Sequence, residues 1–178
     1  MLIPCTHFQA SFADSRLGLE PQAPASIRWD EHGGTFVLKV DGLTVTELTA
    51  PPVSSGCRLE FSLTPVATLI SALQEFAGLH QLPLAAAPAP TLTDPLLLAA
   101  CHLPGKNLFI FAEEPTLTAS RHGNTIELAV AGAFKARRVP CQATDLVLHL
   151  SKPSMTRLVA FVLSQARTLS SQRSAANS

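Results

Sequence analysis

Hydrophobic and polar residues alternate along this chain in short runs, each bounded by turn-forming residues. Such runs lie at residues 26–30, 35–41, 43–48, 57–63, 116–121, 125–131, 133–139 and 146–150. A period of two predicts β-strands that bury one face. Two other segments repeat hydrophobic residues at helical spacing: Val66, Leu69, Ile70, Leu73 and Phe76 in the first, and Met155, Leu158, Val159, Val162 and Leu163 in the second. These two segments are predicted to be amphipathic helices.

The order of these segments repeats. The eleven residues from His32 to Gly42 match those from His122 to Gly132 at a constant offset, with six identities. One predicted strand precedes each match, and further strands and one helix follow it. Both helices begin with a hydroxyl residue near a proline, at Thr64-Pro65 and at Ser151-Lys152-Pro153, which is typical of helix N-termini. The sequence therefore predicts two ββββα units, at residues 26–79 and 116–168.

The expected fold class is α+β, with mostly antiparallel sheets and two main helices. Each unit has one hydrophobic sheet face and one hydrophobic helix stripe, so we expect the units to pack about a pseudo-two-fold axis around one core. This single domain would span residues 26–168. Outside the two units we expect an N-terminal arm at 1–25, in which Phe8 and Phe12 could add a strand, and a Pro-rich crossover at 80–107. The crossover would be a linker or a lid with a short helix at Pro95–His102, and a disordered tail would follow at 169–178.

The strand Arg58-Leu59-Glu60-Phe61-Ser62-Leu63, which runs into the helical pattern from Val66 to Phe76, resembles the strand-to-helix junction of Whirly and PUR-repeat proteins. The resemblance covers the two repeat units. It implies that two ββββα repeats pack together and that their sheets hold single-stranded nucleic acid. Proteins that bind single strands present aromatic residues in a basic groove, whereas here aromatic residues make up 6% and Trp29 is the single tryptophan.

Composition excludes several classes of protein. Hydrophobic residues are 47% and charged residues 15%, which is unlike a wholly disordered chain. Thirteen basic and thirteen acidic residues give zero formal charge, which argues against binding nucleic acid or a membrane by bulk charge. The first residues show no secretory signal, and no hydrophobic run approaches the length of about 20 residues that spans a bilayer. We therefore expect a cytoplasmic protein with no membrane partner.

Charge is divided unevenly along the chain. Residues 1–102 hold four basic and nine acidic residues, a net charge of −5, and residues 103–178 hold nine and four, a net charge of +5. Either the two repeats attract each other, or the second repeat faces an anionic partner, or a solvated outer face simply keeps the sheet from pairing edge to edge. The candidate residues for binding an anionic partner are Lys135, Arg137 and Arg138 on one strand and, as neighbours, Arg121, Lys106 and Arg157.

Motifs for catalysis or metal binding are missing from the sequence. The four cysteines are dispersed, and Cys5-x-His7 and Cys101-His102 each offer only two ligands. His32 and His122 both precede glycine, which favours a role in turns over catalysis. We expect no enzymatic activity, no cofactor and no metal. The leading hypothesis is a protein-interaction or assembly module that self-associates through sheet edges or helix faces. The alternative is a single-stranded nucleic-acid-binding protein that uses the basic strand of the second repeat.

Overall fold

The computed structural model describes residues 1–12, 15–21, 24–48, 56–63, 65–84, 91–94, 96–103, 108–138 and 145–177. It confirms the predicted α+β class with two main helices and antiparallel strands. The elements in chain order are β1 (Leu2–Ile3), β2 (Cys5–Phe12), β3 (Ser15–Pro21), β4 (Ala25–Asp30), β5 (Thr35–Asp41), β6 (Leu43–Leu48), β7 (Gly56–Ser62), α1 (Val66–Leu79), β8 (Thr91–Thr93), β9 (Leu98–Leu103), β10 (Leu108–His122), β11 (Thr125–Arg138), β12 (Asp145–Leu150) and α2 (Lys152–Ala176).

The strands form one hydrogen-bonded path in the order β1-β4-β5-β12-β9-β10-β11-β7-β2-β3-β6, and β8 also pairs with β10. Every pair is antiparallel. The last strand of each predicted unit lies beside the other unit: β7 pairs with β11, so that Leu59 faces Leu128, and β12 pairs with β5, so that Leu148 faces Leu38. The two predicted units are therefore tied together by backbone hydrogen bonds as well as by side-chain packing.

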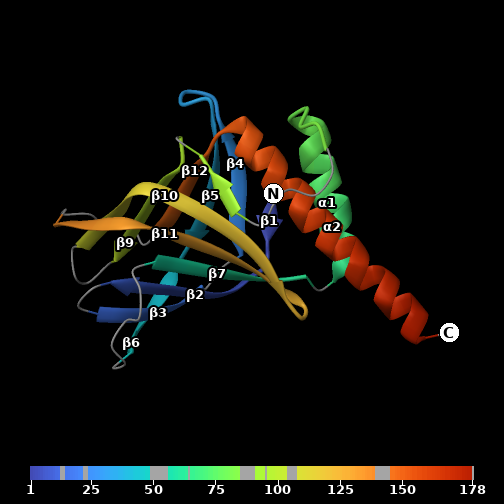
Figure 1. Cartoon of the computed structure of the whole chain (residues 1–178), viewed down its shortest axis with the longest axis horizontal. Coiled ribbons are helices and arrows are strands. Elements are labelled where there is room, and N and C mark those ends of the chain that lie inside the picture. Colours follow the sequence, from blue (N-terminus) through green and yellow to red (C-terminus); the bar gives the residue numbers. More distant parts are fainter. Residues whose placement is uncertain are drawn as a thin grey trace.

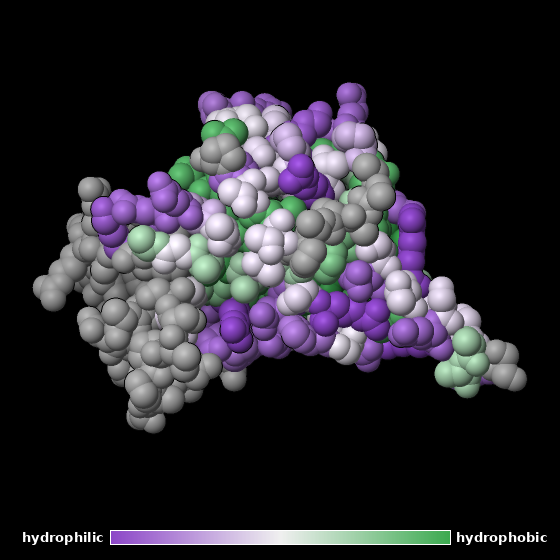
Figure 2. Space-filling view, in the orientation of Figure 1, coloured by the Kyte–Doolittle hydropathy of each residue, from purple (hydrophilic) through white to green (hydrophobic). Residues whose placement is uncertain are grey.

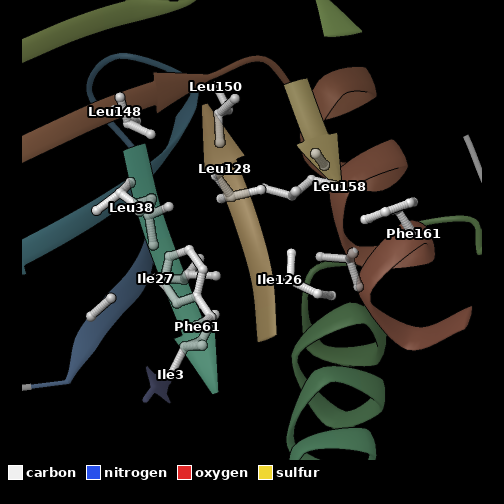
Figure 3. Packing of buried hydrophobic residues seen from close by; sticks show 14 of the residues in the cluster. Ile3, Ile27, Leu38, Phe61, Ile126, Leu128, Leu148, Leu150, Leu158 and Phe161 are labelled. Carbon is white, nitrogen blue, oxygen red and sulfur yellow. The ribbon is translucent and has the colours of Figure 1, made fainter. Parts of the chain in front are cut away.

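The helices lie next to each other on one side of the strands, and α2 continues past the strands at its C-terminal end (Figure 1). Hydrophobic side chains from strands and helices point into a shared interior (Figure 3). Of the residues predicted to lie on the inner helix faces, Leu69, Leu73 and Leu158 are buried and Val162 is partly buried. On the face seen in Figure 1, hydrophobic residues gather over the middle of the strands, and hydrophilic residues surround them (Figure 2).

The N-terminal segment differs from the expected arm. Residues 2–21 form β1, β2 and β3, and β2 lies between β3 and β7 inside the sheet. Phe8 and Ala10 on β2 are completely buried. An alternating run that has partners on both edges is part of the core, so this segment belongs to the domain itself.

The crossover and the tail also differ from the expectation. The helix predicted at Pro95–His102 is wrong, because Leu97 and Ala99 are buried while Leu96 and Leu98 are exposed, and this period of two belongs to a strand. Strand β9 fills the space between β12 and β10. The predicted strand at 116–121 is the second half of one longer strand, β10, which has an irregularity between Glu113 and Thr116. The expected tail is helical as far as Ala176, and Leu169 is buried.

Candidate functional site

The basic residues predicted to bind an anionic partner lie in several places. Lys135 is exposed on β11, and its Nζ lies 2.5 Å from Glu113 Oε1 on the neighbouring strand. Arg121 donates hydrogen bonds from Nε to the Gly123 carbonyl at 2.9 Å and from Nη2 to Gln172 Oε1 at 3.2 Å. Arg157 is exposed on α2. Only the backbone of Arg137 and Arg138 is described, and Lys106 lies outside the described residues.

The β10–β11 hairpin separates two of these candidates. Arg121 faces Ile126 next to the turn, whereas Lys135 faces Phe111, ten residues further along β10. At about 3.3 Å per residue the two positions are roughly 30 Å apart. Arg121 and Lys135 therefore lie at opposite ends of the β10–β11 hairpin, and the ion pair with Glu113 offsets the charge of Lys135. The single-stranded nucleic-acid hypothesis stays a prediction.

The described cysteines are poor nucleophiles. Burial raises the pKa of the Cys57 thiol to about 12. Burial also raises the pKa of the Cys5 thiol to about 11, although a hydrogen bond to the His7 carbonyl opposes the shift. Both groups are therefore protonated at neutral pH. Within the part of the chain that the structure describes, no three His, Cys, Asp or Glu side chains lie together as a metal site would require.

A different feature stands out where α1 ends. The Leu82 N–H donates to the Ala77 carbonyl at 2.8 Å and the Gln81 N–H donates to the Gly78 carbonyl at 3.2 Å, the two bonds of a Schellman motif. Gln81 takes the left-handed conformation that this motif needs, with a φ of 52°. The motif turns the chain back so that Leu82 is buried, and it leaves Leu79 in the last turn 73% exposed.

Four aromatic rings lie between this helix end and the strands. Trp29 on β4 contacts Phe36 on β5 with the two rings tilted by 56° and their centroids 4.6 Å apart. Phe36 also contacts Phe76 edge-on at 5.9 Å and His80 at 5.5 Å, and the Phe76 and His80 rings are 4.7 Å apart. Phe36 and Phe76 are buried, but Trp29 and His80 are only partly so. The cluster therefore joins the core to the surface.

Two open cavities flank these rings, and both are lined by Trp29, Leu79 and His80. The larger has a volume of about 530 Å³ and is also lined by Ile27, Phe76 and charged side chains at its rim. The smaller, of about 210 Å³, continues toward Gln81 and Lys152. Together they form a groove beside β4 and the last turns of α1, which we call the Trp29 groove. It combines hydrophobic walls with a charged rim, as protein-interaction surfaces commonly do.

The Trp29 groove runs along an edge of the sheet. β4 pairs with β5 on one side and with β1 on the other, but β1 covers only the first half of β4. Its coverage ends where the Ile27 N–H donates to the Met1 carbonyl at 2.9 Å. Alternate residues of a strand direct their N–H and C=O groups to the same side, so those of Trp29 point to the same edge as those of Ile27. No described strand pairs with them there.

Charged side chains alternate with Trp29 on this edge. Arg28 is exposed, and no described residue gives it a hydrogen bond or an ion pair. Asp30 accepts hydrogen bonds from the N–H groups of Gly33 and His32, and these bonds lower the pKa of its carboxyl group. Arg28 and Asp30 lie on the face of β4 opposite to Trp29, since side chains alternate along a strand.

The Trp29 groove was not among the sites expected from the sequence. Phe36 and Phe76 belong to the core. The available signal was Trp29 itself, the single tryptophan, which stands between Arg28 and Asp30. A large aromatic residue flanked by charges on an alternating strand is suited to a partly exposed surface. The run alone did not show that β4 lies near the end of the sheet.

Comparison with known proteins finds no matching family model, no matching curated protein and no matching solved structure. Of the two helices, neither combines the length and the hydrophobicity needed to cross a membrane, in the residues that the structure describes.

Proposed function

We propose that this protein is a non-enzymatic interaction or assembly module and that the Trp29 groove is its binding surface. One observation carries the proposal: a groove of about 530 Å³ exposes Leu79 and part of Trp29 next to a strand edge that no described strand pairs with beyond Ile27. Tryptophan dominates the binding energy at many protein interfaces, particularly when neighbouring residues keep water away from it.

The packing beneath the groove supports this function. Phe36 is 1% exposed and Phe76 is 4% exposed, so Trp29 and His80 rest on a fixed floor. A surface that is ordered before binding loses little conformational entropy when a partner arrives. Leu79, in contrast, is exposed at the end of α1, and no described residue covers it. Burying such a side chain contributes about 1.5–3 kcal/mol to binding.

The tandem repeat is part of the proposal, and we extend it to nearly the whole chain. Strand β1 pairs with β4 through Ile3 and Ala25, and β8 pairs with β10 through Leu92 and Leu117. In the same way, β2 pairs with β7 as β9 pairs with β12, and β7 pairs with β11 as β12 pairs with β5. These matching pairs support a duplicated unit related by a pseudo-two-fold axis. The duplication provides two similar frames, and the first carries the Trp29 groove.

A photo-crosslinking experiment tests the interaction function. Benzoylphenylalanine replaces Leu79 in the groove or, as the matched control, the exposed Thr168 on α2. After irradiation of cells that express the protein, we expect an adduct of defined mass from position 79 and none from position 168. Equal adduct formation from the two positions, or none from position 79, contradicts the proposal. Mass spectrometry of the adduct identifies the partner.

A further inference from the structure

We infer that the partner of the Trp29 groove is a second copy of this chain, joined edge to edge through β4. This inference rests on the proposed function and names its partner. The structure already shows what this edge accepts. β1 lies on the first half of β4 as an antiparallel strand, in line with the open half (Figure 1). The occupant of the open half is thus expected to be another antiparallel strand.

The register of such a pair follows from the hydrogen bonds. The open edge offers the N–H and C=O of Trp29, because the equivalent groups of Ile27 are bonded to Met1. When two β4 strands meet across a two-fold axis, Trp29 therefore faces Trp29 of the second copy. Each tryptophan then donates its N–H to the carbonyl of the other. This contact is isologous, so it closes as a dimer and leaves no free β4 edge for further growth.

Charge complementarity selects this register. With Trp29 facing its own counterpart, Arg28 of each copy lies opposite Asp30 of the other copy. Two cross-strand pairs of opposite charge result, and Arg28 of each copy also borders the larger cavity. Opposite charges directly across a strand pair stabilise it, and like charges destabilise it. Arg28 has no ion pair among the described residues of its own chain, so it is available for this role.

The hydrophobic side of the edge also fits a second copy. The two-fold axis of an antiparallel edge pair is perpendicular to the sheet, so both α1 helices lie on the same face of the joined sheet. The Trp29 grooves of the two copies then open toward each other. Leu79, which is 73% exposed in the single chain, lies at this junction in both copies. Burial of hydrophobic surface adds to the two backbone hydrogen bonds, which alone would be a weak contact.

Arg121 on β10 lies at the position that corresponds to Trp29 on β4, but its side chain is bonded to a helix. Arg121 follows the segment of β10 paired with β8, as Trp29 follows the segment of β4 paired with β1. There the guanidinium bonds to Gln172 on the extended part of α2. The corresponding position on β4 carries a tryptophan without such a cover, which suits a surface that meets a partner.

A charge-exchange experiment tests the register. Sedimentation velocity at about 100 µM follows association of the wild type and of Arg28→Glu, Asp30→Lys and the control Arg167→Glu, which reverses an exposed charge on α2. The wild type and the control are expected to be dimers. When Arg28→Glu or Asp30→Lys is measured by itself, two like-charged pairs lie in the contact. The dissociation constant of the dimer should then rise at least about 10-fold. Mixing these two variants places Glu opposite Lys and Arg opposite Asp, so a heterodimer should form.

Each outcome decides the inference. A monomeric wild type, a dimer that Arg28→Glu leaves unchanged, or a mixture that remains monomeric overturns it. Circular dichroism and thermal unfolding check that each variant folds, because Asp30→Lys removes the acceptor of two turn hydrogen bonds. If Asp30→Lys does not fold, Asp30→Asn replaces it. Asparagine can still accept the turn bonds and removes the like-charge pairs, so its mixture with Arg28→Glu should associate more tightly than Arg28→Glu alone.

The same measurements separate this inference from the interaction function. If the wild type is monomeric while position 79 still crosslinks to an unrelated protein, self-pairing is wrong and the interaction function stands. If the adduct has twice the mass of the chain and the mixture forms a heterodimer, both are supported. If neither dimer nor adduct forms, both fail.

Discussion

The two helices of this protein have similar inner faces but different ends. α1 has 14 residues and stops at a Schellman motif, beyond which Leu79 and Trp29 border an open groove. α2 has 25 residues, buries Leu169 and contributes Gln172 to a hydrogen bond with Arg121 on the neighbouring strand. The N-termini differ as well, since Ser151 caps α2 whereas Pro65 provides no side-chain cap for α1. The longer helix thus reaches a side chain of β10, whereas the shorter helix ends with Leu79 exposed.

The largest expected effects test whether the helices contribute equally to one core. Leu69 on α1 and Leu158 on α2 are 5% and 4% exposed. Replacing either by alanine should lower the free energy of unfolding by about 2–5 kcal/mol, through lost transfer energy and a residual cavity. Urea denaturation of the two variants measures this. If one substitution costs less than about 1 kcal/mol, that helix does not share the common core.

The second test concerns the helix ends directly. Leu169→Ala should lower the free energy of unfolding by about 2–4 kcal/mol, because Leu169 lies on the extended part of α2 and is buried. Leu79→Ala serves as the matched variant on α1 and should change stability by less than about 0.5 kcal/mol, since Leu79 is exposed. Thermal unfolding at a concentration below that of any dimer makes the comparison. Equal losses would show that Leu79 is covered within the single chain.

The third test concerns the anchored start of α2. Asp94 Oδ2 accepts the Ser151 N–H at 2.9 Å, and Oδ1 accepts the Leu96 N–H at 2.8 Å. Burial opposes ionisation of Asp94, but the hydrogen bonds from Ser151 and Leu96 outweigh it and lower its pKa. Asp94→Asn should cost about 1–3 kcal/mol at pH 7, because one buried N–H loses its acceptor.

The pH dependence of stability provides a check on the same residue. A lowered carboxyl pKa contributes stability that is present above the unfolded value of about 3.9 and is lost as the pH falls through the folded value. The difference in stability between wild type and Asp94→Asn should therefore shrink on acidification below about pH 4. Denaturation measured between pH 7 and pH 3 tests this, and a difference that stays constant would assign the loss to packing.

The smallest expected effect is a gain in stability at the end of α1. Gln81 occupies a left-handed conformation, which costs a non-glycine residue roughly 1–2 kcal/mol. Gln81→Gly removes this cost but adds freedom to the unfolded chain, so we expect a net gain of about 0.5–1 kcal/mol. Gln81→Ala keeps the strain and is the control. A loss of stability in the glycine variant would show that the Gln81 side chain supports the helix end.

Part of this fold could be predicted from local patterns. Residues that share the buried face of a strand or helix recur at a fixed spacing, so hydrophobic residues recur at that spacing in the sequence. Alternation predicted β4, β5, β6, β7 and β12 to within a residue or two, and helical spacing predicted both helices. The pattern failed at Pro95–His102, where prolines and a capping aspartate resemble a helix start, yet Asp94 instead ties the chain to Ser151. For the charged candidates, the sequence did not predict that Arg121 and Lys135 lie at opposite ends of a long hairpin.

The sequence by itself determined which face of each strand and helix is buried. Hydrophobic residues lie on one face of each element, and moving that face out of water is favourable. Tertiary structure alone decided which strands are neighbours. Backbone hydrogen bonds are the same for every residue, so a strand with one hydrophobic face can pair with any other such strand, and here β7 and β12 pair with strands of the opposite unit. The Trp29 groove exists because β4 meets only a short partner and α1 ends early, and both conditions depend on contacts between segments distant in the chain.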